Sequence, residues 1–138
     1  FLPHILQLTY VQNTGAAFSI LSRHTWVLAL VSLAASVFLA VLLFKRVFPR
    51  PFAMFCLSLV LAGAIGNLID RIATGVVVDY INVLFMNFAI FNFADICVCV
   101  GVGLLMVWVL FDSYFKEKAE KSVKTESAAP ADDANGKN

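Results

Sequence analysis

Residues 25–44 read TWVLALVSLAASVFLAVLLF and contain no charged residue. A helix of this length crosses the roughly 30 Å hydrocarbon core of a bilayer. Two further apolar runs follow it, PFAMFCLSLVLAGAIGNLI at residues 51–69 and ICVCVGVGLLMVWVLF at residues 96–111. One such run could be a buried helix of a soluble protein. Three of them in a chain of 138 residues predict an integral membrane protein.

The composition agrees with this prediction. Apolar residues make up 61% of the chain and charged residues only 14%, whereas a soluble domain is about one quarter charged. We therefore predict an all-α polytopic membrane protein with a small extracytoplasmic β element. Spans are expected at about residues 25–44, 51–70 and 95–114, within a membrane domain of residues 1–115. The polar stretch 116–138 is predicted to be a disordered tail.

The basic residues indicate how the spans are oriented. A basic loop separates the first two spans and four lysines follow the third; these residues are Lys45, Arg46, Arg50, Lys116, Lys118, Lys121 and Lys124. The positive-inside rule places this loop and the C-terminus in the cytoplasm. Residues 1–24 and 70–95 then face the other side of the membrane. Because residues 1–24 contain no segment that could export them, we expect the chain to lack the first span of a longer parent.

Short extended segments are predicted outside the spans. ILQLTYVQ (5–12) alternates apolar and polar residues, which is typical of a strand, and NTGAAFS (13–19) is typical of a turn. GVVVDYINV (75–83) is rich in β-branched residues and predicts a second strand. The aromatic segment LFMNFAIFNF (84–93) suits a position at the membrane interface.

Polar residues gather at the outer ends of the predicted spans: Asn13, Asn67, Asp70, Arg71, Asp79, Asn92 and Asp95. Ionisable residues in such places are functional candidates by default. Asp70 and Arg71 could instead fix the end of the second span, although Arg71 could also bind a substrate carbonyl or carboxylate. Asp95 could simply cap the third helix. Asp79 is harder to explain by structure alone, because Asp is a poor strand residue.

Two aspartates at one face of the membrane can form an acid–base pair. Two carboxylates in contact share one proton, so that one can activate water while the other polarises a carbonyl. His4 and His24 are isolated, and Cys56, Cys97 and Cys99 lie inside predicted spans without a zinc or disulfide pattern. We therefore expect no metal, no cofactor and no Ser-His-Asp triad. The residues favour an aspartyl hydrolase at the membrane surface.

Three segments together resemble the lipoprotein signal peptidases, or signal peptidase II: NTGAAFS (13–19), GNLIDRIATGVVVDYI (66–81) and FNFADICVCVG (91–101). The resemblance implies a membrane aspartyl endopeptidase with four transmembrane helices. Such an enzyme removes the signal peptide from diacylglyceryl-modified bacterial prolipoproteins and cuts before the lipidated cysteine. The resemblance places it in the bacterial inner (plasma) membrane, with its active site at the extracytoplasmic face. It also implies inhibition by globomycin, contact with membrane lipid and no nucleic-acid partner.

The same resemblance implies roles for individual residues. The catalytic pair falls on Asp79 and Asp95, and Asp70 is expected to support the site. The substrate-binding positions fall on Asn13, Gly15, Asn67, Arg71 and Asn92. The sequence departs from the family where a proline is common, at Ala89 and Ile90, and where Phe is common, at Tyr80. The family's first span, with its DQxxK-like box, is missing, so activity is assigned to the parent protein.

The residues alone leave two other functions open. Acids in membrane proteins also carry protons, which would suit a proton-coupled transporter component. Here the acids are confined to the ends of the predicted spans, which counts against that function. A non-catalytic membrane scaffold would use Asp79 and Asp95 only for pairing and capping.

Overall fold

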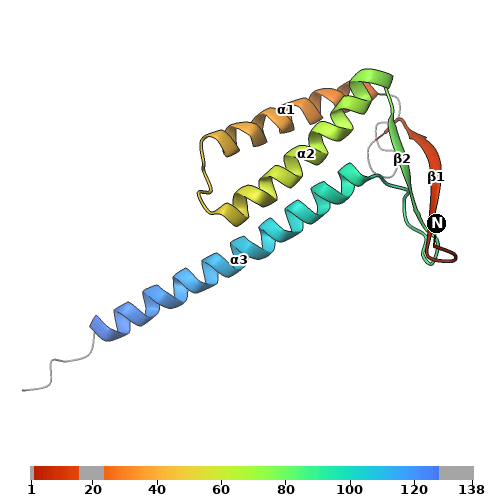
Figure 1. Cartoon of the computed structure of the whole chain (residues 1–138). Coiled ribbons are helices and arrows are strands. Elements are labelled where there is room, and N and C mark those ends of the chain that lie inside the picture. The colour runs from red at the N-terminus through yellow and green to blue at the C-terminus, as the bar shows by residue number, and fades with distance from the viewer. Residues whose placement is uncertain (1, 16–23, 128–138) are drawn as a thin grey trace, which may run out of the picture. The chain divides into compact units, whose positions relative to one another are not determined.

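The computed structural model describes residues 2–15 and 24–127. Its elements are β1 (Leu6–Asn13), α1 (Thr25–Phe44), α2 (Pro51–Thr74), β2 (Val77–Val83) and α3 (Phe93–Ser127) (Figure 1). Within the described residues, three helical stretches are long and apolar enough to cross a membrane: α1, α2 and Phe93–Lys116 of α3. The predicted fold class, a polytopic helical membrane protein with a small β element, is thereby confirmed. The chain divides into two compact units, Phe1–Leu105 and Met106–Asn138.

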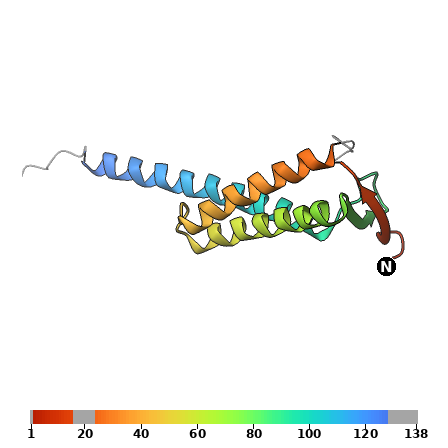
Figure 2. The same cartoon turned by 90° about the horizontal axis from the view of Figure 1, so that it is seen from above.

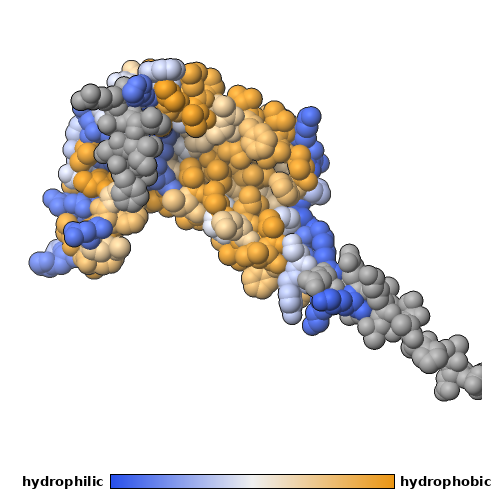
Figure 3. All heavy atoms as spheres, turned by 180° about the vertical axis from the view of Figure 1, so that it is seen from behind, coloured by the Kyte–Doolittle hydropathy of each residue, from blue (hydrophilic) through white to orange (hydrophobic). Residues whose placement is uncertain are grey.

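In the first unit, α1 and α2 lie side by side, joined by residues 45–50 (Figures 1 and 2). α2 begins at Pro51, because proline lacks the N–H that the first helical turn would leave without a partner. It ends at Gly75, which has a φ of 78° and donates its N–H to the Arg71 carbonyl. α2 thus extends one turn beyond the predicted span and holds Arg71 in its last turn. On the face shown in Figure 3, hydrophobic side chains cover the helices, as lipid contact requires.

β1 and β2 form a two-stranded antiparallel sheet at the end of α2 (Figure 1). Leu6 pairs with Val83 and Asn13 with Val77, with an irregularity in register between Leu8 and Val11. Both predicted strands are therefore present. Residues 16–19 of the predicted turn lie outside the described residues. The sheet pairs segments that α1 and α2 separate in the sequence, so it brings Asn13 beside β2.

The first turns of α3 pack closely against α2 at two glycines. A Cβ atom at Gly63 would overlap the carbonyl oxygen of Ala94 and lie 2.7 Å from Val98 Cγ2. A Cβ atom at Gly101 would lie 2.8 Å from the carbonyl oxygen of Cys56. Small residues allow helix backbones this close in membranes. The contact at Gly63 is one turn below Asn67, so it determines how near Asn67 comes to the start of α3.

The second unit holds the rest of α3, which remains helical to Ser127. The sequence predicted disorder from residue 116, so the helix runs about three turns further than predicted. Lys and Glu, which make up most of residues 116–127, are strong helix formers. Lys116 Nζ also lies 2.7 Å from Asp112 Oδ2, an i,i+4 ion pair that supports the helix. Residues 128–138 of the predicted tail lie outside the described residues.

Candidate active site

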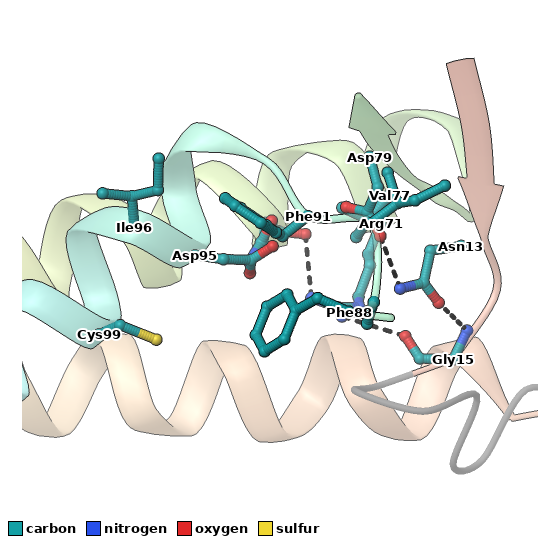
Figure 4. A pocket seen from close by; sticks show the side chains of 13 residues that line it. Asn13, Gly15, Arg71, Val77, Asp79, Phe88, Phe91, Asp95, Ile96 and Cys99 are labelled. Carbon is teal, nitrogen blue, oxygen red and sulfur yellow. Dashed lines mark hydrogen bonds between the residues drawn. The ribbon is translucent and has the colours of Figure 1, made fainter. Parts of the chain in front are cut away.

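A cavity of about 420 Å³ lies where β1, β2 and the segment before α3 meet the ends of α2 and α3. Six of the eight predicted site residues line it: Asn13, Gly15, Asn67, Arg71, Asp79 and Asp95 (Figure 4). They come from the end of β1, the last turns of α2, β2 and the first turn of α3. The fold therefore brings together residues that are up to 82 positions apart, from Asn13 to Asp95. Asn92 lies buried beside them, and Asp70 is not among the lining residues.

Asp79 is the more enclosed of the two aspartates, with only 3% of its surface exposed. Its Oδ2 accepts a hydrogen bond from Asn13 Nδ2 at 2.8 Å, and its Oδ1 accepts one from Asn92 Nδ2 at 2.9 Å. Burial raises the pKa of Asp79 above its ordinary value of 3.8. The nearby Asp95 raises this pKa too, while the two amide donors and Arg71 act against the increase. The net effect is a raised pKa, so Asp79 binds a proton more readily than a free aspartate.

Asp95 is held at the N-terminus of α3 by a reciprocal cap. The Asn92 backbone N–H donates to Asp95 Oδ2, and the Asp95 backbone N–H donates to Asn92 Oδ1, both at 3.1 Å. This is a capping box, in which the first residue and the third helical residue satisfy each other's backbone donors. Asn67 Nδ2 donates to the remaining oxygen, Asp95 Oδ1, at 2.8 Å. Both carboxylate oxygens of Asp95 therefore accept N–H donors, which fix the orientation of this side chain.

Asn92 connects the two aspartates. Its Nδ2 donates to Asp79 Oδ1 and, at 3.0 Å, to Asn67 Oδ1. A continuous chain of hydrogen bonds thus runs from Asn13 through Asp79, Asn92 and Asn67 to Asp95. Asn92 reaches this position because Phe91 turns back onto β2: Ile81 N–H donates to the Phe91 carbonyl at 2.8 Å, and Phe91 N–H donates to the Ile81 carbonyl at 3.2 Å.

Arg71 links three parts of the site through its guanidinium. Nη1 donates to the Asn67 carbonyl at 3.3 Å and to Ser32 Oγ of α1 at 3.5 Å. Nη2 donates to the Gly15 carbonyl at 3.5 Å, and Gly15 N–H in turn donates to Asn13 Oδ1 at 2.9 Å. These contacts are long for hydrogen bonds. The Arg71 guanidinium therefore lines the cavity while keeping hydrogen-bond donors that these contacts do not fully use.

Asp70 points away from the cavity lining and supports the sheet. Its Oδ2 accepts the backbone N–H of Val78 at 3.3 Å, and Val78 is the residue that precedes Asp79. On the other side of Asp79, the Tyr80 hydroxyl accepts the Phe93 N–H at 3.2 Å. Tyr80 is a position where the sequence departs from the family. Its hydroxyl supplies a partner for one of the first N–H groups of α3, which a phenylalanine could not do.

The structure adds residues that sequence reasoning did not assign to the site. One wall of the cavity is apolar, and its residues are Phe88, Ala89, Ile90, Phe91, Ile96 and Cys99. The aromatic run before α3 was expected at the membrane interface. Because it lies in the sequence between Asp79 and Asp95, its position could have indicated that it forms part of the site. Ser32 in α1 was also missed, because nothing in an apolar span distinguishes it from Ser36, the other serine of that helix. Residues 2–15 and 24–127 hold no group of three His, Cys, Asp or Glu side chains that could bind a metal ion.

Comparison with known proteins gives consistent results. The model of a family described as signal peptidase (SPase) II matches residues 1–111. A lipoprotein signal peptidase of Streptococcus agalactiae is 39% identical over 107 residues, which cover 78% of this chain and 70% of that protein. A lipoprotein signal peptidase of Enterococcus faecalis is 42% identical over 124 residues, which cover 90% of this chain and 74% of that protein. A solved structure, described as a bacterial membrane enzyme determined by the in meso method, superposes with a TM-score of 0.76 at 36% identity. That match covers 82% of this chain and 70% of the other.

Proposed function

The chain belongs to the signal peptidase II family, and on this premise we propose that Asp79 and Asp95 are the catalytic pair with which it cleaves the signal peptides of prolipoproteins. The observation that carries the proposal is the hydrogen-bonded chain that joins the two carboxylates through Asn92 at the edge of a cavity. The enzyme is a membrane protease of lipoprotein processing. Its two carboxylates supply the acid and the base that an aspartyl mechanism needs.

The surroundings of the two carboxylates support different roles for them. Asp79 is buried in the sheet and its pKa is raised, so we assign it the role of the acid, which donates a hydrogen bond to the scissile carbonyl. Asp95 is held in the first turn of α3 by two N–H donors and lines the cavity, where a water molecule can reach it. Asp95 therefore acts as the base that activates a water molecule.

The remaining polar residues of the site serve the substrate and the pair. Asn13, Gly15, Asn67 and Arg71 line the cavity and are placed to bind an extended peptide backbone. Arg71 has the most donor capacity left, since its three contacts are long. Asn92 is only 4% exposed, and both its amide group and its backbone N–H are bonded within the site. Its role is to hold the two aspartates in register while the neighbouring residues bind substrate.

The substrate is a prolipoprotein whose cysteine carries diacylglycerol, and cleavage occurs before that cysteine. The apolar wall of the cavity suits a substrate that reaches the site sideways from the bilayer, past residues 84–92. Phe85 is 70% exposed and Phe88 54%, as expected of side chains at a membrane interface. Globomycin, a cyclic peptide antibiotic, would compete for the same cavity.

We place the protein in the bacterial inner (plasma) membrane with the catalytic pair at the extracytoplasmic face. The basic loop between α1 and α2 and the lysines of α3 support a cytoplasmic position for that loop and the C-terminus. The polar groups of the site lie at the opposite ends of α2 and α3, next to the sheet. A transporter would require acids through the depth of the spans, and α1 and the first nineteen residues of α2 contain none.

The proposal is tested by cleavage of a diacylglyceryl-modified prolipoprotein by the full-length protein in lipid. We expect Asp79→Asn and Asp95→Asn each to reduce kcat by at least about 10²-fold, because each removes a proton-transfer group. A thermal melt establishes that each variant is folded. Asp112→Asn, the same Asp-to-Asn change at a residue that does not line the cavity, is the matched control. A folded Asn variant that cleaves near the wild-type rate would exclude the catalytic pair and favour a scaffold.

A further inference from the structure

A second hollow lies at the other end of α1 and α2, away from the aspartates. It is a groove of about 480 Å³ between the end of α1 and the start of α2, and its lining includes Leu43, Phe44, Arg46, Met54, Ser58 and Leu61. The Ser58 hydroxyl already donates to the Met54 carbonyl at 2.8 Å. The groove therefore presents an apolar surface with one cationic side chain, that of Arg46.

Arg46 has an unusual backbone conformation for an arginine. α1 ends in a pair of bonds in which Arg46 N–H donates to the Leu43 carbonyl at 3.1 Å and Val47 N–H donates to the Leu42 carbonyl at 3.2 Å. This arrangement requires a left-handed residue, and Arg46 has a φ of 48°. Glycine is the usual residue there, because any side chain costs roughly 1–2 kcal/mol in that conformation. The chain thus keeps a long cationic side chain at a position where glycine would be more stable.

The basic character of the loop does not by itself account for Arg46. Lys45 and Arg50 also carry positive charge in this loop, and neither lines the groove. No Asp or Glu lines the groove, and residues 1–69, which supply its whole lining, contain neither residue. The first acid, Asp70, lies almost six turns along α2 from Arg50. The groove lining thus holds one cationic group and no anionic group, so its charge is complementary to a negative group on another molecule.

We propose that this groove binds an anionic phospholipid of the bilayer. The acyl chain lies along the apolar surface formed by Leu43, Met54 and Leu61, and the headgroup phosphate accepts hydrogen bonds from the Arg46 guanidinium. The planar guanidinium forms paired bonds with phosphate oxygens. Basic pockets between transmembrane helices bind anionic headgroups in this way. The site is independent of the catalytic pair, and it does not depend on which leaflet the loop faces.

The test is thermal unfolding of the full-length protein in a neutral detergent, titrated with phosphatidylglycerol or phosphatidylcholine. Wild type is expected to show a larger rise in Tm with phosphatidylglycerol. Arg46→Gly is expected to melt at or above the wild-type temperature without lipid, because the left-handed strain is gone. It should then need about tenfold more phosphatidylglycerol for the same rise, because a charged hydrogen-bonding partner is lost. Arg46→Gln keeps the strain and should show the same loss of response.

Lys45→Gln is the matched control, because it removes an equal charge from the neighbouring residue outside the groove. It is expected to keep the wild-type response to phosphatidylglycerol. An unchanged response in Arg46→Gly would overturn the proposal. An equal loss in Lys45→Gln would also overturn it, since diffuse attraction to the loop would then explain the effect. A comparable rise in Tm with inorganic phosphate alone would show that the acyl chain, and hence the groove, is not involved.

Discussion

Gly63 is predicted to control the catalytic geometry through the distance between α2 and α3. In Gly63→Ala the new Cβ would lie 2.7 Å from Val98 Cγ2 and would overlap the Ala94 carbonyl oxygen. Ordinary contact begins at 3.4 Å, so α3 must move away by about 0.7 Å at this level. The bond from Asn67 Nδ2 to Asp95 Oδ1 is 2.8 Å long, and such bonds weaken beyond about 3.2 Å. The bond therefore tolerates a lengthening of about 0.4 Å, and a displacement of about 0.7 Å exceeds that.

The expected result separates catalysis from stability. Overpacking costs about 1–3 kcal/mol, and the better helix propensity of alanine returns about 1 kcal/mol of that. The net loss of stability is therefore small, and the variant folds. Misplacing a catalytic group by about 1 Å costs up to 10²-fold in rate, so we expect kcat to fall by one to two orders of magnitude. KM should change less, because Asn13 and Arg71 remain in place. The measurements are kcat and KM for prolipoprotein cleavage and Tm by thermal melt.

Two glycines of α3, Gly101 and Gly103, provide control substitutions for Gly63→Ala. A Cβ at Gly103 meets no atom within 4 Å, so Gly103→Ala should keep the wild-type kcat and melt at or slightly above the wild-type temperature, because alanine favours the helix. A Cβ at Gly101 would lie 2.7 Å from Val60 Cγ2, a clash like that at Gly63 but two turns further from Asp95. Gly101→Ala should lower Tm about as much as Gly63→Ala and lower kcat far less. If both variants lose kcat in proportion to Tm, the glycines act on stability alone and the positioning argument is refuted.

Three further predictions concern the residues around the pair. The pKa of Asp79 is raised in the folded protein, so the folded protein binds this proton more tightly than the unfolded chain does. The free energy of unfolding should therefore fall as the pH rises from about 4 through the folded-state pKa. Asp79→Asn should remove this component from the slope of Tm against pH, and an identical slope in the variant would contradict the assignment. Asp70→Ala leaves the Val78 N–H without its acceptor and should lower the free energy of unfolding, measured by denaturation, by about 1 kcal/mol. Asp70→Asn keeps an acceptor oxygen, so its free energy of unfolding should stay close to that of wild type. Tyr80→Phe removes the acceptor for the Phe93 N–H and should destabilise the start of α3 by about 1 kcal/mol. The measurement is hydrogen exchange of the backbone amides in the first turn of α3, which should become faster. Unchanged exchange would show that water replaces the hydroxyl as the acceptor.

Some features of this protein follow from local sequence alone. The length and apolarity of residues 25–44 and 51–69 define membrane helices, because crossing the bilayer is a requirement on consecutive residues. The β-branched run around Asp79 predicts a strand for the same reason. The family motifs indicated the chemistry and proposed Asp79 and Asp95 as the pair. Only the extent of the elements differed: the sequence did not show that α2 continues to Thr74 or that α3 continues to Ser127.

The partnerships within the site could be decided only by the tertiary structure. Asn13 is 66 positions from Asp79, and Asn67 is 28 positions from Asp95, yet each pair is joined by a hydrogen bond of 2.8 Å. No local pattern encodes such contacts, since they depend on the pairing of β1 with β2 and on the close approach of α2 and α3 at Gly63. The unequal burial of the two aspartates and the strained Arg46 beside an apolar groove arise in the same way. Helix length is a local property of the chain, whereas the protonation and hydrogen bonding of a side chain depend on which distant segments fold against it.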